Sequence, residues 1–476
     1  MKILIIGSGV FGVSSAIQLR KYGFEVSIID RSPIPALDAA STDISKVLRT
    51  DYGVDKVYTR LCLKAKKKFL EFNKDSKVKL YHESGVAMLA KESNQCDLDS
   101  ISTIKSLSDD VNGINLLNDS QVRLEFLKSK PGFKKFFDIY KNGYFNNASG
   151  WVNAEESINF FIKKAREIGV NFFCGNGYGF RNFVYEDIKT KEKILGVETT
   201  DSTYFDCELV LVAAGSWTPS ILPELKGCLT STGHPVLLIK VPPELRDKYS
   251  YPNFSVWSAD VTKTGFYGFP LNEDNILKIA IHGSGYVTST DSPLTVLDNK
   301  NLQIPIQDLE KIRNFCIKHF PDLFESENDS EVFNTRICWY CDSFDSDFFI
   351  TSVPSLSKNL VIATGGSGHA FKFLPVLGEL VLPVVLKTLN DFQQTNFKTE
   401  LKIEPKFLFR SPTNHKFSIY NTDEYEKNKN LLGKESMRLV EDIVPLSLED
   451  QIFSTRVEFN NFFKAKDNSA VLNSML

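Results

Sequence analysis

Residues 2–30, KILIIGSGVFGVSSAIQLRKYGFEVSIID, contain two apolar runs separated by a glycine-rich turn and a helical pattern. Lys2–Ile6 has the composition of a buried strand, and Val13–Tyr22 places apolar residues at helical spacing. Val26–Ile29 is a second strand that ends at Asp30. The segment therefore predicts a βαβ unit whose glycines lie between the first strand and the helix.

Three glycines in that turn, Gly7, Gly9 and Gly12, have the spacing of a dinucleotide-binding fingerprint. The first permits the tight turn, the second lets the backbone approach a pyrophosphate, and the third lets helix and strand pack closely. The helix start supplies amide donors for phosphate, and Asp30 is placed to accept hydrogen bonds from a ribose. The pattern predicts a dinucleotide without separating NAD from FAD, and a glycine-rich turn with no nucleotide is the plain alternative.

Length and charge narrow the possible classes of protein. The 476 residues are enough for two or three folding units of ~100–200 residues each. A net charge of -3 gives no field that favours phosphate backbones, so nucleic acid is not expected as a partner. The most apolar stretch, Val376–Leu386, is interrupted by Glu379 and Pro383, so no membrane span is expected. Because Met1 leads directly into the first strand, no removable leader is expected either.

Segments of two kinds alternate along the chain, which predicts an α/β fold of two intertwined domains with a cleft between them. Nucleotide-type segments with strand and helix patterns alternate with segments that are turn-rich or strand-rich and aromatic. A polar tail follows, with Phe and Leu spaced to pack on something. The expected division is a nucleotide-binding domain of residues 1–90, 151–218 and 331–400, a second domain of residues 91–150 and 219–330, and a docked tail of residues 401–476.

Lys278 lies in the apolar strand Ile276–Ile281, where an ammonium group is out of place. A buried lysine costs several kcal/mol unless it meets an acceptor or loses its proton. Strand alternation puts Lys278, Ala280 and His282 on one face, so the lysine and the histidine can reach one site. The alternative is an edge strand with a solvated polar face.

Cys338-Trp339-Tyr340-Cys341 has the spacing of a redox or zinc motif. A second Cys/His pair that could complete four zinc ligands is not apparent, so no metal is predicted. A thioredoxin-like site needs its first cysteine at a helix N-terminus, whereas an acidic stretch follows here. Two small buried cysteines are the plain alternative.

Several motifs occur in order over most of residues 1–400, and together they resemble the sarcosine oxidase-like flavin amine oxidases. This family includes monomeric sarcosine oxidase, pipecolate oxidase, saccharopine oxidase and the fructosyl amino acid oxidases, or amadoriases. The motif at residues 367–372 is the most specific, because it departs from the family's SGHGFK only at Ala370. Beside the glycine fingerprint the motifs are Ser41-Thr42-Asp43-Ile44-Ser45-Lys46-Val47-Leu48-Arg49 with Asp51-Tyr52-Gly53, Gly150-Trp151, Ala214-Gly215-Ser216-Trp217, Tyr267-Gly268-Phe269-Pro270, Arg336-Ile337-Cys338-Trp339 and Ser367-Gly368-His369-Ala370-Phe371-Lys372.

The resemblance implies a Rossmann-like FAD-binding domain of the glutathione-reductase type, interleaved with a mixed-sheet α+β substrate domain. It also implies that the sulfur of Cys338 is bonded to the 8α carbon of the flavin, with Cys341 structural. The residues expected to contact FAD are Gly7, Gly9, Val10, Phe11, Gly12, Asp30, Arg31, Ser41, Thr42, Ser45, Lys46, Gly215, Trp217, Cys338, Gly366, Ser367, Gly368, His369, Phe371 and Lys372.

Five catalytic or substrate-binding residues are also implied by the resemblance. Arg49 and Lys372 match the pair that holds the substrate carboxylate, and two cations in a dry cleft recognise a carboxylate strongly. Lys278 matches the lysine near flavin N5 that promotes the reaction with oxygen, and Tyr267 and His282 match positions that line the pocket. Amadoriases have an acid where this chain has His282, yet the residues around Lys372 look amadoriase-like. The saccharopine and fructosyl amino acid branches therefore both stay open.

The expected activity is oxidation of a secondary amino acid to an imine, with oxygen reduced to hydrogen peroxide. The expected substrate is saccharopine or a fructosyl amino acid, with pipecolate or sarcosine as the alternative within the family. An NAD-dependent dehydrogenase and a non-catalytic flavoprotein are more distant alternatives. The family favours a monomer. The last residues, Ser474-Met475-Leu476, resemble a peroxisomal tripeptide, so a peroxisomal or cytoplasmic location is expected.

Overall fold

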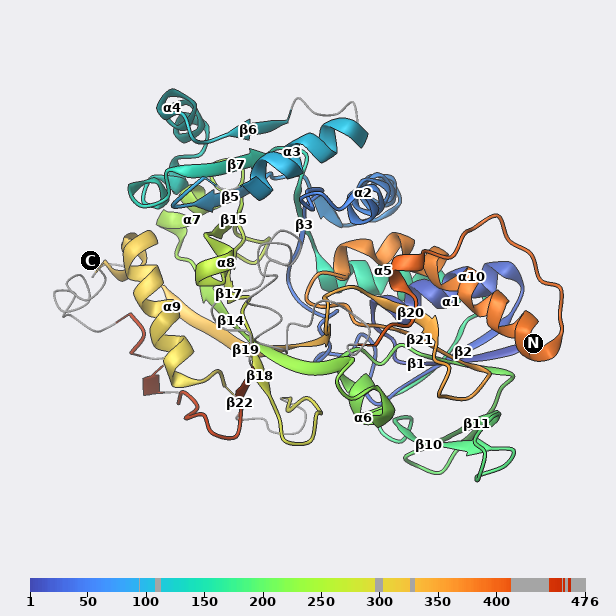
Figure 1. Cartoon of the computed structure of the whole chain (residues 1–476). Helices are drawn as coiled ribbons and strands as arrows, with labels where there is room; N and C mark the ends of the chain where they lie inside the picture. Colours follow the sequence, from blue (N-terminus) through green and yellow to red (C-terminus); the bar gives the residue numbers. More distant parts are fainter. Residues whose placement is uncertain are drawn as a thin grey trace.

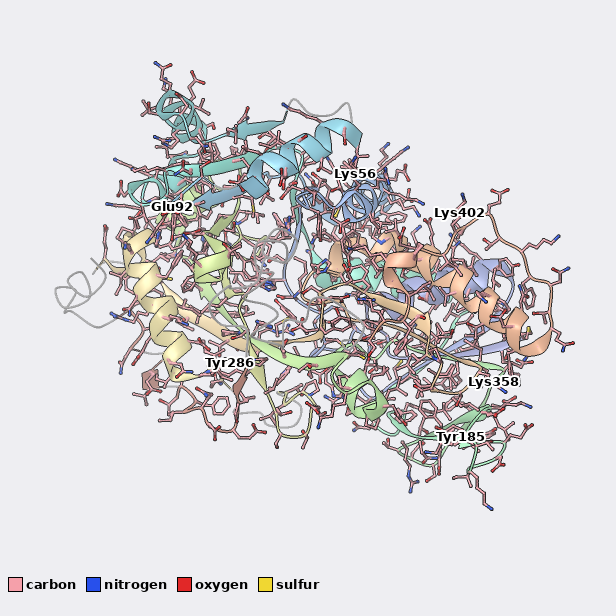
Figure 2. The ribbon with its side chains drawn as sticks, in the orientation of Figure 1. Lys56, Glu92, Tyr185, Tyr286, Lys358 and Lys402 are labelled. Atoms are coloured by element: carbon pink, nitrogen blue, oxygen red, sulfur yellow. The ribbon has the colours of Figure 1, made fainter. Side chains whose placement is uncertain are left out.

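A computed structural model gives the fold in two connected halves, each built on one large sheet (Figure 1). It describes residues 1–93, 95–107, 113–295, 303–325, 330–411, 445–455, 457–458 and 461–463. Charged side chains such as those of Lys56, Lys358 and Lys402 lie at the periphery (Figure 2), while the space between the elements is filled by apolar side chains. The α/β class expected from the sequence is confirmed.

The smaller of the two large sheets contains the βαβ unit predicted from the first thirty residues. Its neighbouring strands are parallel, except that β20 runs antiparallel to β21. Because β1 lies in the middle of this sheet, the turn that follows β1 reaches the centre of one sheet edge. The strand order is β20 (Phe349–Ser352), β21 (Leu360–Thr364), β13 (Leu209–Val212), β1 (Lys2–Ile6), β2 (Glu25–Asp30) and β9 (Asn171–Cys174).

Four helices form one core with this sheet: α1 (Val10–Tyr22), α2 (Lys56–Asp75), α5 (Ala154–Glu167) and α10 (Leu374–Gln393). Helices α1 and α10 pack with almost no space between their backbones. A Cβ atom on Gly378 would lie 2.2 Å from the carbonyl oxygen of Ser14. The segment Phe371–Gln393 is long and apolar enough to cross a membrane, but 78% of its most apolar window is buried inside the protein. Its apolar character is therefore explained by core packing.

The larger sheet is mixed and has an aromatic core, in which Trp257, Phe266 and Phe315 stack. Helix α9 (Ile306–His319) supplies Phe315 to that core. The strand order is β22 (Leu446–Ser447), β18 (Tyr286–Val287), β14 (Leu229–Lys240), β17 (Ile276–Ile281), β16 (Phe266–Gly268), β15 (Val256–Ala259), β5 (Val86–Ala90), β7 (Asn142–Asn146) and β6 (Ile114–Leu116), and β19 (Glu331–Ser343) also pairs with β14.

The strand that carries Lys278 is an interior strand. β17 pairs with β14 on one side and with β16 on the other, and Lys278 lies opposite Leu238. The alternative of a solvated edge strand is therefore wrong.

Two small sheets and several short helices complete the described part of the chain. The sheet β3-β8-β4 brings Lys46 beside the strand that carries the Gly150-Trp151 motif. The strands are β3 (Lys46–Leu48), β8 (Gly150–Val152) and β4 (Tyr81–His82) in one sheet, and β10 (Phe180–Tyr185), β11 (Ile194–Thr199) and β12 (Tyr204–Asp206) in the other. The remaining helices of four or more residues in one α-helical run are α3 (Gln95–Leu107), α4 (Ser120–Ser129), α6 (Thr218–Ile221), α7 (Pro243–Tyr249) and α8 (Val261–Thr264).

The proposed domain division stays a prediction, but two strands depart from it. β5 falls within residues 1–90 and β19 within residues 331–400, which were assigned to the nucleotide domain, and both pair in the larger sheet. In the tail, the described residues Phe407, Leu448 and Phe462 are buried. The C-terminal tripeptide lies outside the described residues.

Candidate active site

A cavity of about 440 Å³ lies at the carboxyl ends of β1, β2, β13 and β21, where ligands bind in open parallel sheets. Residues that the sequence assigned to FAD form much of its wall. They are Gly7, Gly9, Val10, Phe11, Asp30, Arg31, Ser41, Lys46, Gly215, Trp217, Gly366, Ser367, Gly368, His369 and Phe371. The other five, Gly12, Thr42, Ser45, Cys338 and Lys372, do not border this cavity.

The turn after β1 has a shape that admits no side chains at two positions. Gly7 has φ +106, and a Cβ atom there would lie 2.5 Å from the carbonyl oxygen of Ala213. A Cβ atom on Gly12 would lie 1.9 Å from the carbonyl oxygen of Gly7. Gly12 therefore acts in packing rather than in contact with a ligand. The resulting cradle places the amides at the start of α1 beside the cavity, which fits a pyrophosphate.

Asp30 borders the cavity but also holds the turn in place. One of its carboxylate oxygens accepts hydrogen bonds from the Ser8 amide at 2.8 Å and the Ser8 hydroxyl at 2.7 Å, and the other accepts from the Ser32 amide at 3.0 Å. Burial raises the pKa of Asp30, and these donors oppose the shift. The carboxylate thus fixes the strand-turn-helix geometry as well as lying where a ribose is expected.

The far end of the cavity is built around a cation–aromatic pair. The guanidinium of Arg31 lies over the ring of Trp217, 4.5 Å from its centroid, and also forms an ion pair with Asp38. This end is closed by residues of strands β10 and β11 and the adjoining turns. None of these residues belongs to a motif found in the sequence. They are Gly179, Phe180, Arg181 and Thr200.

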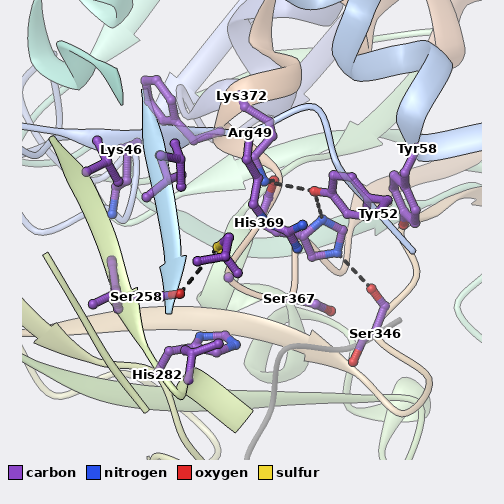
Figure 3. Close-up of a pocket in the computed structure, with 18 of the residues that line it drawn as sticks. Lys46, Arg49, Tyr52, Tyr58, Ser258, His282, Ser346, Ser367, His369 and Lys372 are labelled. Carbon is purple, nitrogen blue, oxygen red and sulfur yellow. Dashed lines mark hydrogen bonds between the residues drawn. The ribbon is translucent and has the colours of Figure 1, made fainter. Parts of the chain in front are cut away.

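A second cavity adjoins the first and contains the expected substrate residues Arg49, His282 and Lys372 (Figure 3). Tyr267 also lines this cavity. The two cavities share six lining residues, so a ligand in one faces a ligand in the other. The shared residues are Lys46, Tyr340, Ser367, Gly368, His369 and Phe371. This junction is where a cofactor ring and a substrate would meet.

Arg49 is a largely buried cation that is held from behind. Its guanidinium donates to the carbonyl and the carboxylate of Asp51, the latter at 3.1 Å. Asp51 is fully buried and also accepts from the Tyr144 hydroxyl at 2.5 Å and the Asn146 amide at 3.0 Å. The cation lies over the Tyr52 ring, 4.5 Å from its centroid. Held in this way, Arg49 is preorganised for an anion in the cavity.

Lys372 is the second buried cation, and its hydrogen-bond partners in the described part of the chain are neutral. Its ammonium donates to the Tyr52 hydroxyl at 2.8 Å and to the His369 carbonyl at 3.3 Å. Burial, together with the smaller effect of the nearby Arg49, lowers the pKa of Lys372 to about 7. A carboxylate between the two cations would relieve this repulsion.

The partners of Lys372 form a directed chain of hydrogen bonds (Figure 3). The hydroxyl of Tyr52 lies 3.1 Å from Nδ1 of His369, and Nε2 of His369 lies 3.0 Å from the carbonyl oxygen of Ser346. A carbonyl only accepts, so Nε2 carries the proton and Nδ1 accepts from Tyr52. Burial and the cation at Lys372 lower the pKa of His369 well below its usual range, which keeps this histidine neutral. Tyr52 was part of the sequence resemblance, but its role was not foreseen.

Lys278 does not border either cavity, contrary to the expectation that it would reach the site directly with His282. Its side chain is 1% exposed. The ammonium donates to the Asp43 carboxylate at 2.6 Å and to the Ser45 carbonyl at 2.8 Å. Lys278 is thus one contact away from Lys46, which lines both cavities and pairs with the same carboxylate.

The two cysteines of the CxxC stretch occupy opposite faces of β19. Cys338 is buried without bordering either cavity, and its sulfur lies 3.5 Å from Nζ of Lys46. Cys341, expected to be structural, borders the cofactor cavity, and its sulfur accepts a hydrogen bond from Thr364 at 3.2 Å. Among the described residues, no three His, Cys, Asp or Glu side chains are placed to hold a metal ion.

Comparison with known proteins gives a family for the chain. The family profile described as FAD dependent oxidoreductase matches residues 2–382. L-saccharopine oxidase of Schizosaccharomyces pombe is 28% identical over 82% of this chain and 90% of its own length. Monomeric sarcosine oxidase of Bacillus sp. is 23% identical over 82% of this chain and 93% of its own length.

Solved structures share the fold. Fructosyl peptide oxidase from E. terrenum superposes with a TM-score of 0.75 and 20% identity, over 96% of this chain and 98% of that structure. These matches agree with the glycine cradle and the cavity at the carboxyl ends of the parallel strands. The chain belongs to the FAD-dependent oxidoreductase family.

Proposed function

We propose that this protein is an oxidase of secondary amino acids that uses oxygen and releases hydrogen peroxide. The observation that carries the proposal is the pair of cations, the largely buried Arg49 and the buried Lys372, in a cavity that shares part of its wall with the FAD cavity. This pair fits a carboxylate and would hold the neighbouring carbon at the junction. The glycine cradle, the α1 amides and the Arg31–Trp217 pair fit FAD.

When bound, FAD would accept a hydride from the carbon beside the substrate amine and pass the electrons to oxygen. The protein side of the reaction is to bind, orient and exclude water. Arg49 and Lys372 grip the carboxylate, while apolar groups such as Met88 and Phe269 line the remaining wall. The amine must be neutral to share its lone pair as the hydride leaves, and the positive charge of the two cations favours that form.

Within this class we propose a substrate with additional carboxylates, of which L-saccharopine is the main candidate. Beside Arg49 and Lys372 the cavity is lined by Lys46 and His282, and His282 stands where amadoriases have an acid. An anionic substituent fits these groups better than a sugar does. A fructosyl amino acid is the second candidate, favoured by the shared fold of the fructosyl peptide oxidases.

The test is peroxide release from the purified protein with L-saccharopine, a fructosyl amino acid, L-pipecolate and sarcosine at equal concentration. We expect the highest kcat/KM with L-saccharopine. Activity only with NAD, or none with any of the four amino acids, would contradict the proposal.

We further propose that FAD is bonded to the sulfur of Cys338, which borders neither cavity but lies 3.5 Å from Nζ of Lys46, a residue that lines both. Cys341 is the matched control, since it is three residues away on the same strand and borders the cofactor cavity. Acid precipitation should leave the pellet yellow for the wild type and for Cys341→Ala, and colourless for Cys338→Ala. A yellow Cys338→Ala pellet would contradict the linkage, and a colourless Cys341→Ala pellet would move it to Cys341.

We also propose that the protein is a monomer, as the family resemblance favours. We propose in addition that it is peroxisomal, because its terminal Ser-Met-Leu resembles a peroxisomal tripeptide and its product is hydrogen peroxide. Light scattering tests the first point. For the second, a fluorescent protein fused before the last ten residues should collect in peroxisomes and disperse when the tripeptide is removed. Dispersed fluorescence in both cases would indicate the cytoplasm.

A further inference from the structure

Asp43 is a buried carboxylate behind the wall that the two cavities share. Its side chain is 2% exposed. One oxygen, Oδ2, lies 2.6 Å from Nζ of Lys278 and 2.9 Å from Nζ of Lys46. The other oxygen accepts a hydrogen bond from the Ile44 amide at 2.8 Å. A single carboxylate therefore joins a lysine that lines both cavities to a lysine that lines neither.

The cluster contains more positive than negative charge. Lys46 and Lys278 share the one carboxylate, and the guanidinium of Arg336 donates to the carbonyls of Thr42 and Ala39, at 2.6 and 3.1 Å, in the same loop. The titratable and charged groups that act on Asp43 or on its two lysines are Lys46 of β3, Tyr267 of β16, Lys278 of β17, and Arg336 and Cys338 of β19.

The charge state of the cluster depends on Asp43. Burial raises the pKa of this carboxyl, but Lys278, Lys46 and Arg336 outweigh burial, so the pKa falls and the group stays ionised. Burial lowers the pKa of Lys278 to about 8, even though Asp43 opposes the shift, and Lys46 adds to it. Without the carboxylate, burial and Lys46 both push Lys278 towards its neutral form, and only the weaker influence of Cys338 opposes them.

We propose that Asp43 is a positioning residue that fixes Lys46 at the junction of the two cavities, holds Lys278 behind it and keeps Lys278 in its ammonium form. The part played in the oxygen reaction rests on the proposed function. The arrangement of the three groups does not, and it can be tested separately.

The first experiment measures the stability of the protein loaded with FAD by urea unfolding, in Asp43→Asn, Lys278→Met and the double variant. Asp43→Asn leaves the buried ammonium of Lys278 and the largely buried one of Lys46 without a carboxylate, whereas Lys278→Met leaves the pair of Asp43 and Lys46. We expect the larger loss in Asp43→Asn and a partial recovery in the double variant. If Asp43→Asn is insoluble while the double variant is soluble, that outcome also counts as recovery in the double variant. Additive losses, or insolubility of both, would overturn the proposal.

The second experiment follows reoxidation by oxygen after reduction with dithionite, so that no amine substrate is needed. In the wild type the rate should fall as the pH rises through about 8, where Lys278 loses its proton. In Asp43→Asn the fall should move down by about one pH unit or more. Asp43→Glu should keep the wild-type profile, and Lys278→Met should show no such step. An unchanged profile in Asp43→Asn would overturn the proposal, whether or not the protein oxidises secondary amino acids.

Discussion

The cofactor cavity and the substrate cavity are built from different parts of the protein. The first contains a cradle of backbone, with glycines and helix amides from neighbouring residues of one strand-turn-helix unit, and other segments complete its wall. The second is formed by charged and aromatic side chains that distant segments bring together. Arg49 and Lys372 are more than three hundred residues apart in the chain, yet both touch Tyr52.

The difference indicates how each cavity should respond to mutation. A cavity made of backbone is sensitive to added volume, because a single methyl group meets immovable carbonyl oxygens. A cavity made of side chains is sensitive to lost charge, because each cation is desolvated and held by a specific acceptor. The following predictions test this contrast, from the largest expected effect to the smallest.

Gly12→Ala should abolish FAD binding, because its Cβ would lie 1.9 Å from the Gly7 carbonyl oxygen and force the turn open. Gly23→Ala is the matched control. Gly23 ends the same helix in a left-handed conformation, with no atom near the new Cβ, so it brings backbone strain without a clash. The ratio of visible flavin absorbance to protein absorbance measures the effect. Full flavin content in Gly12→Ala would show that the cradle is not needed.

Arg49→Met should lower kcat/KM by roughly 30- to 1,000-fold, equivalent to about 2–4 kcal/mol, because one of the two carboxylate partners is lost. FAD content should be unchanged. Arg20→Met is the control: Arg20 is a partly buried arginine remote from the site that donates to the carbonyls of Ile168 and Phe24. Steady-state kinetics with the best substrate tests this, and equal losses in the two variants would contradict it.

Lys278→Met should slow reoxidation by oxygen about 100-fold, a typical effect of removing one preorganised charge. Reduction of the flavin by the amino acid should change much less. Stopped-flow traces of the two half-reactions, recorded separately, distinguish them. Equal slowing of both would indicate that Lys278 supports the site as a whole.

Binding of glutarate, a carboxylate without an amine, should weaken about tenfold between pH 6 and pH 8. The pKa of Lys372 is lowered to about 7, so its ammonium form is present below that pH and is lost as the pH rises through it. Titration of the flavin spectrum with glutarate gives the Kd. Lys372→Met should bind weakly with no pH dependence over this range, and a parallel pH dependence in the variant would exclude Lys372 as its source.

How far the sequence predicted each cavity follows from the same contrast. The unit from Lys2 to Asp30 is determined by local patterns, so its strands, helix and turn were predicted closely. The β10 and β11 wall of the cofactor cavity was missed, because no local signal marks Phe180 or Arg181 as lining residues of that cavity. Within the substrate cavity, Arg49 and Lys372 were identified through family motifs, but their hydrogen-bond and ion-pair partners were not predicted.

Lys278 shows where that information ends. Its motif predicted a lysine at the site, and alternation predicted the face that it shares with His282. Neither the motif nor the alternation could show that the ammonium of Lys278 binds to Asp43, which is more than two hundred residues away in the chain. Nor could they show that Asp43 also pairs with Lys46, which lies between Lys278 and the cavities. Ion pairs between residues that are far apart in the sequence depend on the tertiary fold, so they cannot be predicted from the spacing of residues along the chain.

The most direct test of the central claim is anaerobic mixing of the purified protein with L-saccharopine while the visible flavin absorbance is followed. The absorbance should be lost on mixing and should return when oxygen is admitted, with one hydrogen peroxide formed for each FAD reoxidised. A flavin that dithionite reduces, but that none of the four secondary amino acids reduces, would contradict the claim.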